Sequence, residues 1–205
     1  MKELNFAHSA SFLTSAVYPK AYPDTGDLPE IAIAGRSNVG KRTLINGLVN
    51  RKRLAKVSNT PGRTQLLNFF LINDAFVLCD LPGYGYAKVP AEVRKNWRPM
   101  IETYLTRREP LKLLMLLVDI RRDPGSFETD LIGWATAQGL AILPVATKLD
   151  KLSASKRKPA LARVAKGLGL DARSLFGWSA LSGEGGEKLW RTLMRRLDIA
   201  HPKRD

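Results

Sequence analysis

The stretch GRSNVGKRT, from Gly35 to Thr43, constrains the fold of this chain more than any other feature. It follows a short apolar run at 30–34 and leads into an apolar pattern with helical spacing at 43–49. A strand, a loop bounded by glycines, a lysine and a helix, in this order, are typical of a phosphate-binding loop. The N–H groups of the loop and the positive end of the helix dipole would then face the phosphates. Lys41 would reach the terminal phosphates as a point charge.

The residue after the lysine departs from this pattern. A Ser or Thr is expected there because its hydroxyl coordinates magnesium, and this chain has Arg42. A guanidinium carries only hydrogen-bond donors and stays protonated, so it cannot ligate a cation. Thr43 lies about 100° further around the helix and faces elsewhere. We therefore expect magnesium binding to be weakened or lost at this position.

Strand-like and helical patterns alternate along the rest of the chain. Strands are predicted at 30–34, 66–72, 76–80, 111–118, 140–146 and 174–178, and helices at 41–50, 91–107, 127–138, 154–168 and 186–197. This order predicts an α/β fold with a mostly parallel, six-stranded sheet covered by helices on both faces. We expect an irregular lead-in at 1–28, a single domain at 29–200 and a short tail at 201–205.

Composition limits the partner and the compartment. Lys and Arg number 33 against 19 Asp and Glu, which gives a formal net charge of +14. At this magnitude we expect an acidic polymer as partner, with nucleic acid as the first candidate. The single cysteine, Cys79, excludes an internal disulfide and fits a reducing cytosol. No run approaches the ~20 apolar residues of a membrane span, so we expect a cytoplasmic, monomeric protein.

Two further segments fit a nucleotide site. Asp80 ends the predicted strand at 76–80, at the sheet edge where ligands of such folds bind, and can hold magnesium directly or through water. Gly83 can bring its N–H to a γ-phosphate. The segment at 59–65, NTPGRTQ, lies where a nucleotide-sensing switch would sit, with Thr64 as the candidate second magnesium ligand and Thr60 as the alternative. An ordinary turn and a plain surface loop are the competing interpretations.

A third set of residues points to the base. The residues Thr147, Lys148, Leu149 and Asp150 follow the predicted strand at 140–146. An aspartate there can accept from the N1–H and N2–H₂ groups of guanine together, whereas adenine offers no such donor pair. The Lys148 stem can cover the base, and the segment Ser179-Ala180-Leu181 can give a backbone N–H to the guanine O6.

Taken together, GRSNVGK, TPGRTQ, DLPGYGYA, TKLD and SAL resemble the EngB (YihA) family of bacterial GTP-binding proteins in order and spacing. This family belongs to the Era-like, translation-associated GTPases, and the resemblance runs from about Glu30 to the C-terminus. It implies a Ras-like domain that binds GTP or GDP with Mg²⁺. It also implies a role in large ribosomal subunit assembly, with ribosomal RNA as partner, and a link to normal cell division and septation.

The resemblance also assigns site residues. Nucleotide contacts carry over to Gly35, Arg36, Ser37, Asn38, Val39, Gly40, Lys41, Arg42, Thr43, Gly62, Arg63, Thr64, Gln65, Leu66, Asp80, Leu81, Pro82, Gly83, Thr147, Lys148, Leu149, Asp150, Trp178, Ser179 and Ala180. Lys41, Thr64 and Gly83 are the catalytic candidates. Thr64 and Asp80 are the metal-ligand candidates, and Arg42 stands at the family's ligand position. Asn38 resembles an asparagine through which related GTPases bind potassium; stabilisation of the loop is the alternative.

The residue after Gly83 bears on hydrolysis. Ras-like enzymes have a glutamine there that orients the attacking water, and this chain has Tyr84. The resemblance therefore implies slow or partner-assisted hydrolysis, which we expect Arg42 to impair further. Two alternatives stay open at this stage. One is a guanine-nucleotide-binding assembly scaffold that no longer hydrolyses GTP, and the other is a basic RNA-binding module with a vestigial nucleotide site.

Overall fold

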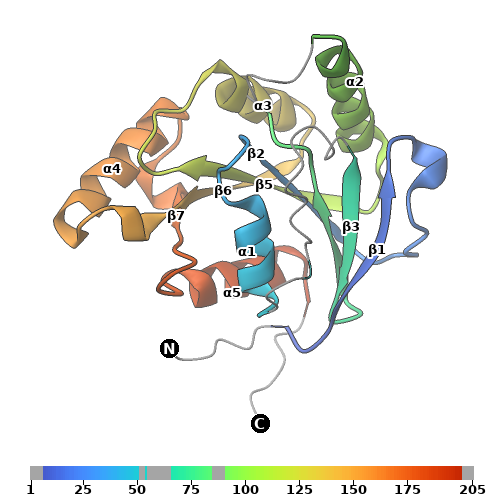
Figure 1. The fold of residues 1–205 in the computed structure, drawn as a ribbon, viewed down its shortest axis with the longest axis horizontal. Helices are drawn as coiled ribbons and strands as arrows, with labels where there is room; N and C mark the ends of the chain where they lie inside the picture. Colours follow the sequence, from blue (N-terminus) through green and yellow to red (C-terminus); the bar gives the residue numbers. More distant parts are fainter. Residues whose placement is uncertain (1–6, 51–53, 55–65, 85–90, 200–205) are drawn as a thin grey trace.

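The computed structural model describes residues 7–50, 54, 66–84 and 91–199. Strands in these residues form a single sheet of seven, in the spatial order β1-β3-β4-β2-β5-β6-β7 (Figure 1). Their bounds are β1 (Ala10–Ala16), β2 (Glu30–Gly35), β3 (Leu67–Ile72), β4 (Phe76–Asp80), β5 (Leu111–Asp119), β6 (Ala141–Thr147) and β7 (Phe176–Gly177). The pairs β2–β4, β2–β5, β5–β6 and β6–β7 are parallel, and β1–β3 and β3–β4 are antiparallel.

Helices cover both faces of this sheet (Figure 1). The α-helices are α1 (Lys41–Leu48), α2 (Ala91–Arg107), α3 (Ser126–Ala137), α4 (Ala154–Gly167) and α5 (Gly186–Arg196), and short 3-10 turns lie at Pro19–Ala21, Leu149–Lys151 and Ala172–Ser174. Successive strand residues point to opposite faces. Ile31 and Ile33 of β2 therefore pack in one core with α1 and α5, while Ala32 and Ala34 pack in the other with α2, α3 and α4. The predicted α/β class, mostly parallel sheet and two-sided helix cover are confirmed.

The predicted count of six strands is wrong, because the segment expected to be an irregular lead-in contributes β1. This strand pairs antiparallel with β3 from Ala10 opposite Ile72 to Ala16 opposite Leu67. Phe12 of β1 packs edge-on against Phe70, with ring centroids 5.7 Å apart. The mixed small, polar and apolar residues of β1 suit an edge strand that is only partly buried, and they hide its strand character in the sequence.

A tight hairpin brings the end of β4 beside the phosphate-binding loop. Asn73 and Asp74 join β3 to β4, with φ of 54° and 52°. Positive φ at both central residues is the requirement of a type I′ turn, which Asn and Asp tolerate. Because β4 then runs parallel to β2, with Asp80 opposite Ile33, Asp80 reaches the same sheet edge as the end of β2.

A buried ion pair fixes the opposite end of β2. Glu30, the first residue of β2, is fully buried and accepts hydrogen bonds from Arg108 and from the Tyr104 hydroxyl. Arg108 also donates to the backbone oxygen of Pro23 and to the Thr25 hydroxyl, at 2.9 and 3.3 Å. One guanidinium thus ties the end of α2, the start of β2 and the segment before β2 together.

Candidate nucleotide site

The predicted phosphate-binding loop connects β2 to α1. Gly40 is the N-cap of α1 and has φ of 110°, a conformation that residues with a side chain rarely adopt. The Lys41 ammonium donates to the backbone oxygen of Gly35 over 3.0 Å, which folds the lysine back over the loop. Burial lowers the pKa of Lys41, and so does Arg42, while the Asp80 carboxylate raises it. The loop therefore has the strand, helix and lysine arrangement that the sequence predicted.

Asp80 lies at the end of β4 with only 4% of its surface exposed. Its Oδ1 atom has no hydrogen-bond partner within the described part of the chain. Burial raises the pKa of this carboxyl, and the charges of Lys41 and Arg42 oppose that shift. Because buried polar atoms nearly always have a partner, this oxygen suits a water or a cation held next to the loop.

These residues fit a magnesium ion only in part. Asp80 supplies a suitable oxygen, but Arg42 adds a positive charge that acts on the same carboxylate. Within residues 7–50, 54, 66–84 and 91–199, no cluster of three or more His, Cys, Asp or Glu could hold a metal. A magnesium ion there would depend on Asp80, on water and on phosphate oxygens. The predicted ligand Thr64 lies outside the described residues, as do Thr60, Gly62, Arg63 and Gln65.

Gly83 lies against the phosphate-binding loop. A Cβ atom at this position would come within 2.8 Å of the Lys41 Nζ and 3.1 Å of the Ser37 backbone N. The end of the lysine could move aside, but the contact with the Ser37 backbone is tighter than an ordinary one, so a side chain at this position would press on the loop. The Ser37 N–H donates to the backbone oxygen of Tyr84 over 2.8 Å, which holds the segment there. The backbone of Gly83 thus lies beside the lysine that the sequence assigned to the terminal phosphates.

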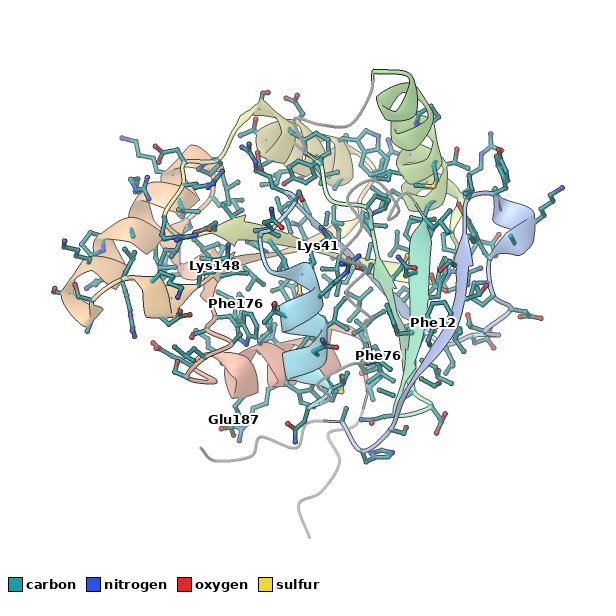
Figure 2. All side chains as sticks on the ribbon, viewed as in Figure 1. Phe12, Lys41, Phe76, Lys148, Phe176 and Glu187 are labelled. Carbon is teal, nitrogen blue, oxygen red and sulfur yellow. The ribbon has the colours of Figure 1, made fainter. Side chains whose placement is uncertain are left out.

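The segment after β6 is tied to the same loop. Thr147, the last residue of β6, donates from its hydroxyl to the backbone oxygen of Val39 over 2.7 Å. The Lys148 ammonium donates to the backbone oxygen of Asn38 over 2.6 Å. Figure 2 shows Lys41 and Lys148 near the N-terminal end of α1. The structure therefore brings together two predicted motifs that are more than one hundred residues apart.

Asp150 is oriented by a buried serine. The Ser179 hydroxyl donates to the Asp150 Oδ1 over 2.8 Å, and Ser179 itself is fully buried. Burial alone would raise the pKa of Asp150, but the hydrogen bonds from Ser179 and from the backbone, together with Lys151, lower it. The carboxylate is therefore charged at neutral pH. A charged carboxylate held in one orientation can accept a pair of donors from a base.

The remaining predicted residues take different positions. Trp178 is buried in the core, where its ring contacts α1 next to Gly47, and its backbone oxygen accepts from the Leu149 N–H. Ala180 is exposed in the turn that follows. Leu66 is described just before β3, where its backbone oxygen accepts from Asn68. Their contacts with a nucleotide stay predictions.

Sequence reasoning missed one charged group at the site. Asp119, the last residue of β5, accepts two hydrogen bonds from the Arg121 guanidinium, at 2.9 and 2.7 Å, and pairs with Lys148 at 3.0 Å. Burial alone would raise the pKa of Asp119, but these hydrogen bonds lower it. The available signal was an acidic residue at the end of an apolar strand, followed by two arginines. The ion pair with Asp119 thus helps to orient the Lys148 ammonium.

Comparisons with known proteins decide the family. A family profile described as a 50S ribosome-binding GTPase matches residues 30–148. The probable GTP-binding protein EngB of Geobacter metallireducens is 50% identical over 182 residues, which cover 89% of each chain. The proteins of the same name from Pelobacter propionicus and Citrifermentans bemidjiense are 50% and 51% identical, over 91% and 92% of this chain and 92% and 88% of theirs.

This chain belongs to the EngB family of GTP-binding proteins. The resemblance found in the sequence is thereby confirmed. Solved structures agree on the fold. A crystal structure of a probable EngB has a TM-score of 0.68 at 20% identity, covering 82% of this chain and 98% of that one. Era bound to MgGDPNP and a piece of 16S ribosomal RNA has a TM-score of 0.60 at 20% identity, covering 87% and 59%.

The phosphate-binding loop, Asp80 and Asp150 lie around one edge of the sheet. Ligands of open α/β sheets bind at the carboxyl ends of the parallel strands, and β2, β4 and β6 all end there.

Among the helices that the structure describes, none is long and apolar enough to cross a membrane.

Proposed function

We propose that this EngB-family chain is a guanine-nucleotide switch that acts in assembly of the large ribosomal subunit. The observation that carries this proposal is the connection between the two halves of the site. Asp150 is fixed by Ser179, and Thr147 and Lys148, a few residues earlier, are bonded directly to the phosphate-binding loop. A base and its phosphates would thus be read by one rigid unit, in a domain spanning 29–200. The proposal includes a monomer in the cytoplasm and a link to normal cell division and septation.

Each half of the site has a defined task in this proposal. Asp150 accepts the N1–H and N2–H₂ donors of guanine, which adenine does not offer as a pair. The loop N–H groups and the N-terminal end of α1 bind the phosphates, and Lys41 neutralises the terminal ones. Asn38, exposed and at φ of 63°, is the position from which potassium would be bound.

Hydrolysis is proposed to be slow or dependent on a partner. Magnesium, when bound, would stabilise the charge that develops on the phosphates; Asp80 and Thr64 would hold it. The Arg42 guanidinium can instead form charge-assisted hydrogen bonds with phosphate oxygens. Because it repels a divalent ion, we propose that it weakens magnesium binding and favours GDP over GTP, relative to a serine at this position.

One titration separates this proposal from its alternatives. Binding of fluorescent GTP, GDP and ATP analogues is measured with and without Mg²⁺. Metal-enhanced binding of GTP, with ATP rejected, supports the switch. Metal-independent guanine binding without phosphate release would indicate a non-hydrolysing scaffold, and the absence of any binding would indicate an RNA-binding module with a vestigial site. The family match favours guanine-nucleotide binding over the last of these.

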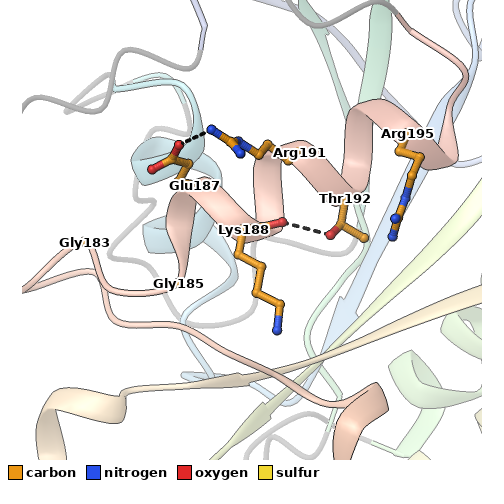
Figure 3. Close-up of a pocket in the computed structure, with 7 residues that line it drawn as sticks. All are labelled: Gly183, Gly185, Glu187, Lys188, Arg191, Thr192 and Arg195. Carbon is orange, nitrogen blue, oxygen red and sulfur yellow. Dashed lines mark hydrogen bonds and ion pairs between the residues drawn. The ribbon is translucent and has the colours of Figure 1, made fainter.

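One side of α5 is the surface that we propose for ribosomal RNA. A pocket there is lined by Gly183, Gly185, Glu187, Lys188, Arg191, Thr192 and Arg195 (Figure 3). Glu187 and Arg191 pair with each other across one turn, at 2.6 Å. Lys188 and Arg195 project together on the other side of the helix (Figure 3). Two cations on one side of a groove, in a chain of net charge +14, suit the phosphates of a nucleic acid backbone.

A matched pair of variants tests this surface. Arg195→Gln removes one charge from the groove, and Arg173→Gln removes one charge from an exposed turn outside it. Affinity for purified large ribosomal subunits is measured from about 50 to about 300 mM salt. Each lost phosphate contact reduces the slope of log affinity against log salt by about 0.7–0.9. The assignment requires that only Arg195→Gln changes the slope; equal effects of the two variants would refute it.

A further inference from the structure

Tyr84, the residue in place of the water-orienting glutamine, directs its side chain toward the start of α3. Its side chain packs against the start of α3, and only 7% of the residue is exposed. The ring stacks on Phe127, with centroids 3.8 Å apart and planes 25° apart. The hydroxyl donates to the Glu128 Oε1 over 3.1 Å. Both partners lie in the first turn of α3.

Glu128 is itself fixed in place. It is 2% exposed, and its second carboxylate oxygen accepts from the Gly125 N–H over 2.9 Å. Gly125 is the N-cap of α3, so this bond belongs to the start of the helix. The Tyr84 side chain is therefore bonded to a rigid helix end that lies more than forty residues away in sequence.

The backbone of Tyr84 is bonded to the phosphate-binding loop. Its carbonyl oxygen accepts the Ser37 N–H over 2.8 Å, and Tyr84 forms a parallel bridge with Arg36. Gly83, one residue earlier, is packed against Lys41 and Ser37. One residue thus joins the phosphate-binding loop through its backbone and α3 through its side chain.

We propose that Tyr84 is a positioning residue, which holds the Gly83 N–H in the place where a γ-phosphate would accept it. This inference rests on the proposed nucleotide switch and adds a role for α3 to it. A fixed donor loses no conformational freedom when the phosphate arrives. GTP carries a γ-phosphate and GDP does not. The positioning of this donor by Tyr84 therefore strengthens the binding of GTP and leaves that of GDP unchanged. A partner that moves α3 would also change GTP affinity, because it would move the Gly83 N–H.

The test compares two tyrosines that make the same kind of hydrogen bond. Tyr84→Phe keeps the ring stack but removes the hydroxyl from Glu128. Tyr104→Phe is the matched control, because the Tyr104 hydroxyl also donates over 3.1 Å to a buried carboxylate, that of Glu30, at the far end of β2. We expect Tyr84→Phe to weaken a non-hydrolysable GTP analogue by about threefold to tenfold, the equivalent of one hydrogen bond, with GDP affinity unchanged. In Tyr104→Phe neither affinity should change.

Phe127→Leu gives a second test from the side of α3, because it removes the ring on which Tyr84 lies. It should lower the ratio of GTP-analogue affinity to GDP affinity in the same direction, so the inference can be tested even if Tyr84→Phe does not fold. The unsubstituted protein must first bind both nucleotides. If the ratio is then unchanged in Tyr84→Phe or in Phe127→Leu, the positioning role of Tyr84 is overturned and the proposed function is not affected. If the unsubstituted protein binds neither nucleotide, both are overturned.

Discussion

Removal of Arg108 should strongly destabilise the fold, because it would leave a charge buried without its partner. Glu30 has no exposed surface, and Arg108 is its only cationic partner among the described residues, with 14% of the Arg108 side chain exposed. In Arg108→Met the Tyr104 hydroxyl would be the one side-chain donor left to the Glu30 carboxylate within the described part of the chain. Breaking such a buried pair costs about 3–5 kcal/mol. With an m value of about 2 kcal/mol/M, the urea midpoint should fall by about 1.5–2.5 M.

The control for this experiment is an exposed ion pair. Arg191 and Glu187 pair across one turn of α5, with 64% and 42% of their side chains exposed, and Arg191→Met should cost about 0.3–0.5 kcal/mol. A double variant, Glu30→Leu with Arg108→Met, should recover much of the lost stability, since replacing both members of a buried pair is often neutral. Urea unfolding is followed by circular dichroism. Equal losses for Arg108→Met and Arg191→Met would refute the role assigned to the buried pair.

Three further predictions concern the site and its surroundings. Arg42→Ser should increase the dependence of GTP affinity on Mg²⁺ and speed phosphate release, because it restores a hydroxyl ligand; equal magnesium dependence in both proteins would contradict this. The pKa of Asp150 is lowered by the Ser179 hydroxyl, so guanine binding should be lost as pH falls through that pKa. In Ser179→Ala the loss should begin at a higher pH, as GDP titrations across acidic pH can show. Burial raises the pKa of the Cys79 thiol, so a thiol reagent should label it only on unfolding, and rapid labelling of the native protein would contradict its buried position.

Local patterns predicted the parts of the site that lie on short stretches of sequence. The strand, glycine loop and lysine at 30–41 form one continuous motif, and each of Asp80 and Thr147 ends an apolar run. The edge of a parallel sheet then brings these ends together. The helix cover on both faces of the sheet was also predictable, because strand and helix patterns alternate along the chain.

Contacts between distant residues could not be predicted in this way. Tyr84 bonds to Glu128, and Arg108 pairs with Glu30, across 44 and 78 residues. Periodicity within a window carries no information on such pairs, since they depend on how the elements pack. β1 escaped prediction because an edge strand buries little surface and needs no regular apolar pattern.

The base preference of the nucleotide site, and its change in Asp150→Asn, test the proposed guanine-nucleotide switch most directly. We expect the unsubstituted protein to bind GDP and to reject ADP. In Asp150→Asn the loss of a charged hydrogen bond should weaken GDP by about 1.5–3 kcal/mol. The same variant should gain affinity for xanthosine diphosphate, because its amide can donate to the oxygen that xanthine carries in place of the guanine amino group. Equal binding of GDP and ADP, or an unchanged GDP affinity in Asp150→Asn, would contradict the assignment of Asp150 to the base.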